Sequence, residues 1–340
     1  MQTKQGPAHN NCFAIIRHLA AIMVIYSHHF ALSGQDEPTF LGSGTLGSLA
    51  VFIFFSISGY LITQSYERRK SNFDYAKKRF LRIYPGLAVC LIFTLYLCCG
   101  LFGKAGWAEW ALSLEPVKTF IRVMVITGVG VVGVMPSDIN DFTSGYLLSN
   151  TMNGSLWTLF FEVFDYIVIA LFLTVFKNKN LAAFIPLILS AIIQVICVKK
   201  GITHLAIIGT SLFTVPFCVG ALLYINRDRW INNLHLKVLM LTAGLLVIYF
   251  ASCGGLLTNV LGPIAICVMT IVIGVSIKDQ LIKGRFDFSF GIYIYAFPVQ
   301  QIVINEMGIP FYASMILSLL ITFVLASLSW FLVEKPMIKR

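Results

Sequence analysis

Charged side chains are scarce in this 340-residue chain. They make up 12% of its residues, against about 25% in soluble domains. Hydrophobic residues make up 58%, and the mean hydropathy is +0.83. A soluble domain of this size needs far more charge to cover its surface, so the composition excludes a soluble enzyme and a disordered chain.

The cysteines lack the spacing of a metal site or a disulfide framework. The chain has eight, all inside or beside apolar stretches, and none belongs to a CxxC pair with a partner pair. We therefore expect small packing residues, with no metal and no bound cofactor. The first apolar run has no small-residue cleavage site after it, which argues against a removable signal peptide. An internal repeat is also lacking.

Long apolar runs recur from one end of the chain to the other, and each is long enough to cross a hydrocarbon layer about 30 Å thick as a helix. They predict an all-α fold, a polytopic transmembrane helical bundle of about ten helices that forms a single domain over residues 1–340. The expected spans are 12–32, 46–66, 83–102, 155–176, 181–198, 204–224, 236–252, 256–277, 287–305 and 311–333.

Basic residues set the expected orientation. With ten spans and both termini cytoplasmic, 20 of the 25 lysines and arginines face the cytoplasm, as the positive-inside rule favours. An eleventh span at 119–135, which is rich in glycine, would reverse every later loop. Residues 103–154 are therefore expected to form an extracytoplasmic, partly re-entrant excursion. The net charge of +10 reports this membrane orientation, and no nucleic-acid partner is expected.

Two polar residues share one face of the first span. Arg17 and His28 are eleven residues apart, almost three helical turns, which separates them by about 16 Å along the axis. A charged side chain in a membrane helix needs a cavity or a partner. The alternative to a polar cavity is that Arg17 is an interfacial anchor and His28 an interfacial histidine. His18 and His29 project to other faces and are expected to be structural.

Two further segments carry candidate chemistry. Arg79 and Arg82, one turn apart before the third span, form a pair of guanidinium forks suited to phosphate, and attraction to anionic lipid is the alternative. Glu162 lies two turns into an apolar span, with Asp165 three residues on. A buried carboxylate there needs a partner or a proton, so Glu162 is either functional or paired with a cation of another span.

The chain resembles the acyltransferase 3 family of bacterial membrane O-acyltransferases over nearly its whole length. The motifs that carry the resemblance are Arg17-x10-His28, VFIFFSISGYLI in the second span, Arg79-Phe-Leu-Arg82-Ile-Tyr-Pro85, Ser155-Leu-Trp157-Thr-Leu-Phe-Phe-Glu162, FDFSFGIYIYAFPV, and Phe331-Leu-Val-Glu334-Lys335-Pro336. The chain departs from the family at Ala296-Phe297-Pro298, where many members have a histidine.

The resemblance implies transfer of an acyl group, usually acetyl, from cytoplasmic acetyl-CoA to a hydroxyl of a surface or lipid-linked glycan. His28 is then the expected base or acyl carrier, and Glu162 orients it. Arg79 and Arg82, with Arg17, are expected to bind the CoA phosphates. Arg17 is also expected in the catalytic set, and Ser155 and Trp157 are expected to bind substrate.

The expected location is the bacterial cytoplasmic (inner) membrane, where membrane lipid, acyl-CoA and a glycan acceptor are the partners. A transporter or flippase of a lipid-linked glycan stays open as the alternative, because it also uses many spans and intramembrane charges. A lipid-binding scaffold fits less well, since it has no need for an aligned arginine and histidine.

Overall fold

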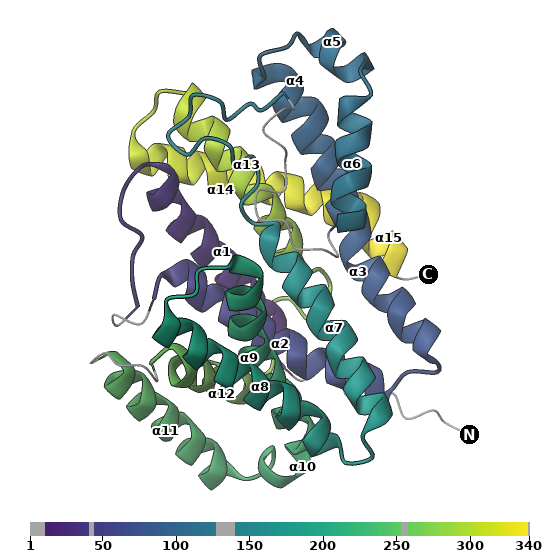
Figure 1. Ribbon diagram of the computed structural model, residues 1–340, viewed down its shortest axis with the longest axis vertical. Coiled ribbons are helices and arrows are strands. Elements are labelled where there is room, and N and C mark those ends of the chain that lie inside the picture. The colour runs from purple at the N-terminus through teal and green to yellow at the C-terminus, as the bar shows by residue number, and fades with distance from the viewer. Residues whose placement is uncertain (1–10, 41–43, 127–139, 253–257, 339–340) are drawn as a thin grey trace.

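The computed structural model describes residues 11–40, 44–126, 140–252 and 258–338, and within these ranges every regular element is a helix (Figure 1). The first half contains α1 (Phe13–Leu32), α2 (Leu46–Glu67), α3 (Asn72–Ile92), η1 (Phe93–Cys98), α4 (Cys99–Phe102), α5 (Trp107–Leu112) and α6 (Glu115–Ile126). The second half contains α7 (Trp157–Val175), α8 (Lys179–Lys200), α9 (Leu205–Ile225), α10 (Arg227–Trp230), α11 (Leu234–Ser252), α12 (Thr258–Ser276), α13 (Ser289–Glu306), α14 (Phe311–Ser329), η2 (Trp330–Glu334) and α15 (Lys335–Ile338).

Seven helices in the described part of the chain are long and apolar enough to cross a membrane. This confirms an all-helical, multi-pass membrane protein. Each of the ten segments expected from the sequence lies on a helix, but the count of ten crossings stays a prediction. Within the described residues, the apolar stretches of α11 and α12 are shorter than these seven helices. Helix α13 is not among the seven.

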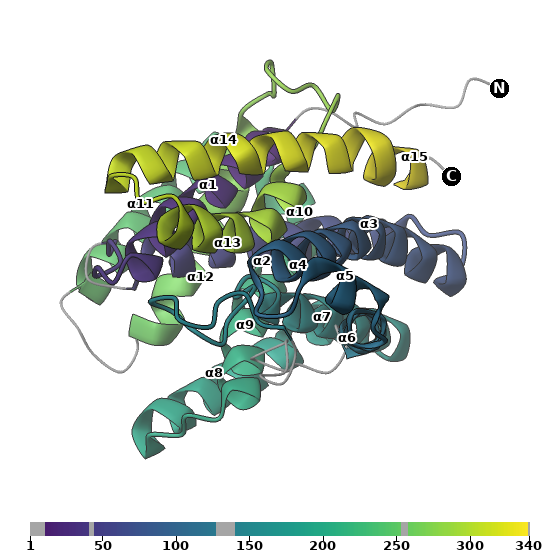
Figure 2. The same cartoon turned by 90° about the horizontal axis from the view of Figure 1, so that it is seen from above.

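Helix α13 is more polar than a lipid-facing span. It lies inside the bundle, where protein surrounds it. Fourteen of its 18 residues are buried, including the amides Gln300 and Gln301. Figure 2 shows α14 along one side of the molecule and α8 along the opposite side, with α13 between α14 and α2. Protein rather than lipid therefore surrounds α13, where the side-chain N–H groups of Gln300 and Gln301 donate to carbonyl oxygens of α1 and of the segment before α7.

Helices α2 and α9 pack backbone against backbone. A Cβ atom on Gly59 would lie 1.9 Å from the Phe217 carbonyl oxygen, and one on Gly220 would lie 2.1 Å from the Ser56 carbonyl oxygen. Small residues permit such close approach between membrane helices, where van der Waals contact drives association. These two glycines fix the position of α2, which forms one wall of the site described below.

The segment expected as an excursion is attached to the end of α13. Gln301 donates hydrogen bonds to the carbonyl oxygens of Leu148 (2.8 Å) and Thr151 (3.1 Å), and Tyr146 donates to Glu306 (2.5 Å). Figure 1 shows α4, α5 and α6 together at one end of the molecule. Most of the doubtful span at 119–135 lies outside the described residues, so its crossing stays untested.

Candidate active site

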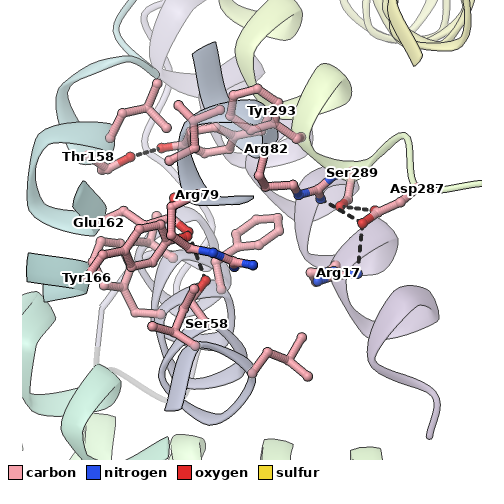
Figure 3. A pocket seen from close by; sticks show the side chains of 18 of the residues that line it. Arg17, Ser58, Arg79, Arg82, Thr158, Glu162, Tyr166, Asp287, Ser289 and Tyr293 are labelled. Carbon is pink, nitrogen blue, oxygen red and sulfur yellow. Dashed lines mark hydrogen bonds and ion pairs between the residues drawn. The ribbon is translucent and has the colours of Figure 1, made fainter. Parts of the chain in front are cut away.

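Helices α1, α2, α3, α7 and α13, together with η2 and α15, line a cavity of about 390 Å³, within the range of small-molecule sites (Figure 3). One end of it is lined by arginines and the other by residues near the beginnings of α2 and α7. Its polar lining consists of Arg17, Ser58, Gln64, Arg79, Arg82, Thr158, Glu162, Tyr166, Asp287, Ser289, Tyr293 and Trp330.

Two of the three arginines meet at one carboxylate oxygen. Asp287 Oδ2 lies 2.8 Å from Arg17 Nη2 and 2.7 Å from Arg82 Nη2. The connection before α13 places Asp287 there, between arginines from α1 and α3. Ion pairs with two guanidinium groups compensate the burial of this carboxylate, of which 14% is exposed.

Arg79 is the cavity arginine without an ion pair to any described residue. It donates a long hydrogen bond to Ser65 Oγ (3.4 Å) and contacts the ring of Tyr75, while its Nε is buried with no partner among the described residues. Arg17 Nε is likewise buried and unpartnered. Three guanidinium groups therefore face one cavity with donors to spare, and planar forks of this kind bind phosphate oxygens in pairs.

Glu162 lies on the side of the cavity opposite Asp287 (Figure 3). Its Oε1 accepts hydrogen bonds from Ser58 (2.9 Å) and from Tyr166. Its hydrogen-bond donors are hydroxyl groups, and in the described part of the chain it has no ion pair with a cation of another span. Asp165 turns away into the protein, where Thr214 donates to its Oδ1 (2.6 Å), so the two carboxylates lie in different surroundings.

His28 does not line this cavity, although it shares α1 with Arg17. Its side chain is half-buried, its Nδ1 is buried with no partner among the described residues, and its ring meets Phe297 with centroids 5.4 Å apart. His29 is buried, accepts from Gln300 (3.2 Å) and contacts Ser314 Oγ (2.9 Å). The two adjacent histidines thus have different hydrogen-bond partners, because neighbouring residues of a helix point about 100° apart.

The two residues expected to bind substrate lie outside the cavity lining. Ser155 is buried and its hydroxyl has no partner in the described chain. Trp157 packs on Phe161 and Phe213, with centroids 5.6 and 5.3 Å away. Gly154, next to Ser155, contacts the Phe297 ring that covers His28. The loop before α7 therefore joins the His28 region without entering the arginine cavity.

Sequence reasoning missed several cavity residues, namely Asp287, Ser58, Tyr166, Tyr293 and Thr158. The last two bridge α13 and α7 by a hydroxyl–hydroxyl hydrogen bond of 2.6 Å. Asp287 lies in the motif FDFSFGIYIYAFPV, but nothing in that pattern singled it out as a partner of Arg17 and Arg82. In the described ranges no three metal-ligating side chains gather at one place.

An arginine-lined cavity within a bundle of apolar helices is chemically suited to an anionic group. The model of the acyltransferase 3 family, an acyltransferase domain, matches residues 10–334, and the chain belongs to this family. It is 38% identical over 336 residues to an O-acetyl transferase of Shigella phage Sf6, covering 97% of each chain. It is 25% identical over 363 residues to Nodulation protein 10 of Rhizobium leguminosarum bv. viciae, covering 99% of this chain and 95% of that protein.

No solved structure matches the chain. Family membership and the phage relative show that the protein is an O-acyltransferase enzyme, which favours the enzyme over the transporter alternative.

Proposed function

We propose that this enzyme transfers an acetyl group from cytoplasmic acetyl-CoA to a hydroxyl of a surface or lipid-linked glycan on the extracytoplasmic side of the bacterial inner membrane. The observation that carries the proposal is the cavity in which Arg17, Arg79 and Arg82 face one another across the bundle. CoA carries phosphate groups, and guanidinium forks are the side chains best suited to bind them. The name of the phage relative supports acetyl as the acyl group.

The arrangement along the cavity fits a donor that enters at the arginine end. Val51 and Thr158, near the beginnings of α2 and α7, line the other end. His28 lies near the end of α1, about 16 Å along that helix from Arg17. We place the thioester end of the donor toward the end of α1, where His28 lies outside the cavity lining.

In the proposed reaction the acceptor hydroxyl oxygen attacks the thioester carbonyl carbon, and the carbon–sulfur bond breaks. His28 takes the hydroxyl proton as general base, and CoA leaves as a thiolate that takes up a proton. His28 Nδ1 has no hydrogen-bond partner among the described residues, and the proposal requires the acceptor hydroxyl to reach this buried nitrogen. Glu162 contributes negative charge on the cavity wall.

Binding of CoA to detergent-purified protein tests the donor site. Charge reversal of both Arg79 and Arg82 to glutamate is expected to abolish binding, because two phosphate donors become repulsive. The matched control reverses Lys77 and Lys78, two exposed cations on the same helix. If lipid attraction were the role of this segment, both double variants would lose membrane insertion and neither would change CoA affinity specifically.

The acceptor is tested in cells. Surface glycans from cells with and without the gene are compared by mass spectrometry for an alkali-labile acetyl group. Its presence only with the active gene is expected, and identical glycans in both strains would contradict a surface acceptor.

A further inference from the structure

The short segment that carries Asp287 is attached to α1 by a histidine. The backbone N–H of Phe288 donates to His18 Nε2 (3.0 Å), and the other ring nitrogen, Nδ1, lies 2.7 Å from the Ala14 carbonyl oxygen. A backbone N–H only donates and a carbonyl oxygen only accepts, so His18 carries its proton on Nδ1. The ring therefore fixes the connection before α13 next to Arg17.

A serine orients the carboxylate itself. Ser289 Oγ donates to Asp287 Oδ1 (2.6 Å), and Ser289 is buried. Oδ1 is thus bound by the serine, while Oδ2 is bound by Arg17 and Arg82 from two different helices. Each arginine uses one Nη2 in this contact, and a guanidinium has five N–H donors, so both keep donors for a ligand.

One carboxylate lies between two guanidinium groups, and the same cavity lining holds a third arginine, Arg79, and a second carboxylate, Glu162. Without Asp287 the two arginines would repel each other in a partly buried place, where each side chain is exposed by only 21–24%. With it they are held together, and both keep N–H donors for an anion. Elsewhere in the chain, Arg227 is half-buried and lies near two carboxylates, 3.5 Å from Glu67 and 3.8 Å from the exposed Asp228.

We propose that Asp287 is a positioning residue that holds Arg17 and Arg82 as a preformed pair of donors for the phosphate groups of the acyl donor. His18 and Ser289 in turn hold Asp287. This inference rests on the proposed function, because it assigns roles within the same donor site. The competing view is that Asp287 occupies the place of a phosphate and weakens donor binding.

Two variants separate these views. Asp287→Asn removes the charge and loosens both arginines, and it is expected to lower the affinity for CoA by about tenfold. Ser289→Ala keeps the charge of Asp287 but removes the bond that orients it, and a smaller loss of the same kind is expected. In steady-state assays KM for acetyl-CoA should rise, while kcat at saturating donor and KM for the acceptor should stay near wild type. Asp228→Asn, an exposed carboxylate paired with an arginine, is the control and should change nothing.

Unchanged or tighter CoA binding by folded Asp287→Asn protein would overturn the proposal. If that variant fails to fold, Ser289→Ala decides, and an unaltered KM for acetyl-CoA in it overturns the proposal equally. Failure of the wild-type protein to bind CoA is a different result, because it removes the donor site itself and the positioning role with it.

Discussion

The imidazole of His28 and the phenyl ring of Phe297 meet edge to face, with ring centroids 5.4 Å apart. Phe297 lies on the buried helix α13, and its ring also contacts the loop before α7 through Gly154. Phe297 therefore contacts His28 on one side and the loop before α7 on the other, near the end of α1. Phe297 thus packs on His28, whose buried Nδ1 has no partner among the described residues, and not on the neighbouring His29.

Replacement of His28 by alanine should abolish acyl transfer without loss of membrane protein. General base catalysis contributes about 10²- to 10⁴-fold, so a loss of at least about 100-fold in kcat is expected. His29→Ala should be milder in catalysis but more harmful to stability, because His29 bonds to α13 and α14. Turnover by purified protein and its thermal unfolding in detergent separate the two effects. Full activity in His28→Ala would remove this residue from the mechanism.

Gly154→Ala should impair catalysis through Phe297. The added Cβ would lie 2.5 Å from the Phe297 ring, so the ring must shift, and it packs against His28. We expect a reduced kcat, with CoA binding unchanged because neither Gly154 nor Phe297 lines the arginine cavity. Gly106→Ala is the matched control, since its Cβ would meet nothing within 4 Å. Equal activity in the two variants would show that the Phe297 position has no influence on the reaction.

The helices were predictable from the sequence wherever they are apolar. The first span, expected at 12–32, is Phe13–Leu32, and the sixth, expected at 204–224, is Leu205–Ile225. Helix α3 begins at Asn72, eleven residues before the expected start, because its first turns are basic and hydropathy detects only the apolar part. Ser71 caps it there by accepting from the N–H of Asp74 (3.0 Å).

The site was predictable only in part. Motif spacing singled out Arg17, Arg79, Arg82 and Glu162, and the structure brings these four to one cavity. Asp287 lies in one of the motifs, but the pattern did not mark it as a site residue, and its contacts join residues 205 and 270 positions apart in the chain. Which helix faces meet depends on packing, such as the contact of α2 with α9 through glycines, and a single sequence does not reveal it.

The glycine contact between α2 and α9 predicts a strong effect on stability. In Gly59→Ala the new Cβ would lie 1.9 Å from a backbone oxygen, which cannot move aside as a flexible side chain does. Overpacking of this kind costs about 1–3 kcal/mol or more. We therefore expect a lower thermal unfolding temperature in detergent for Gly59→Ala and Gly220→Ala. Gly262→Ala, a helical position with open space around its Cβ, should be neutral, and equal behaviour of all three would contradict the close packing.

The proposed direction of transfer predicts which side of the membrane each loop faces. Lys118 on α6 and Lys177 before α8 are both exposed, and the distribution of basic residues places them on opposite sides. Single cysteines at these positions, in a cysteine-free background, are probed on intact cells with a membrane-impermeant thiol reagent. Position 118 should react at once, and position 177 only after permeabilisation. The functional consequence is that the acceptor meets the protein on the side of α6 and of His28, while CoA reaches the arginines from the cytoplasm. Labelling of position 177 from outside would reverse the orientation, put the arginine end of the cavity outside the cell, and contradict a cytoplasmic acyl donor.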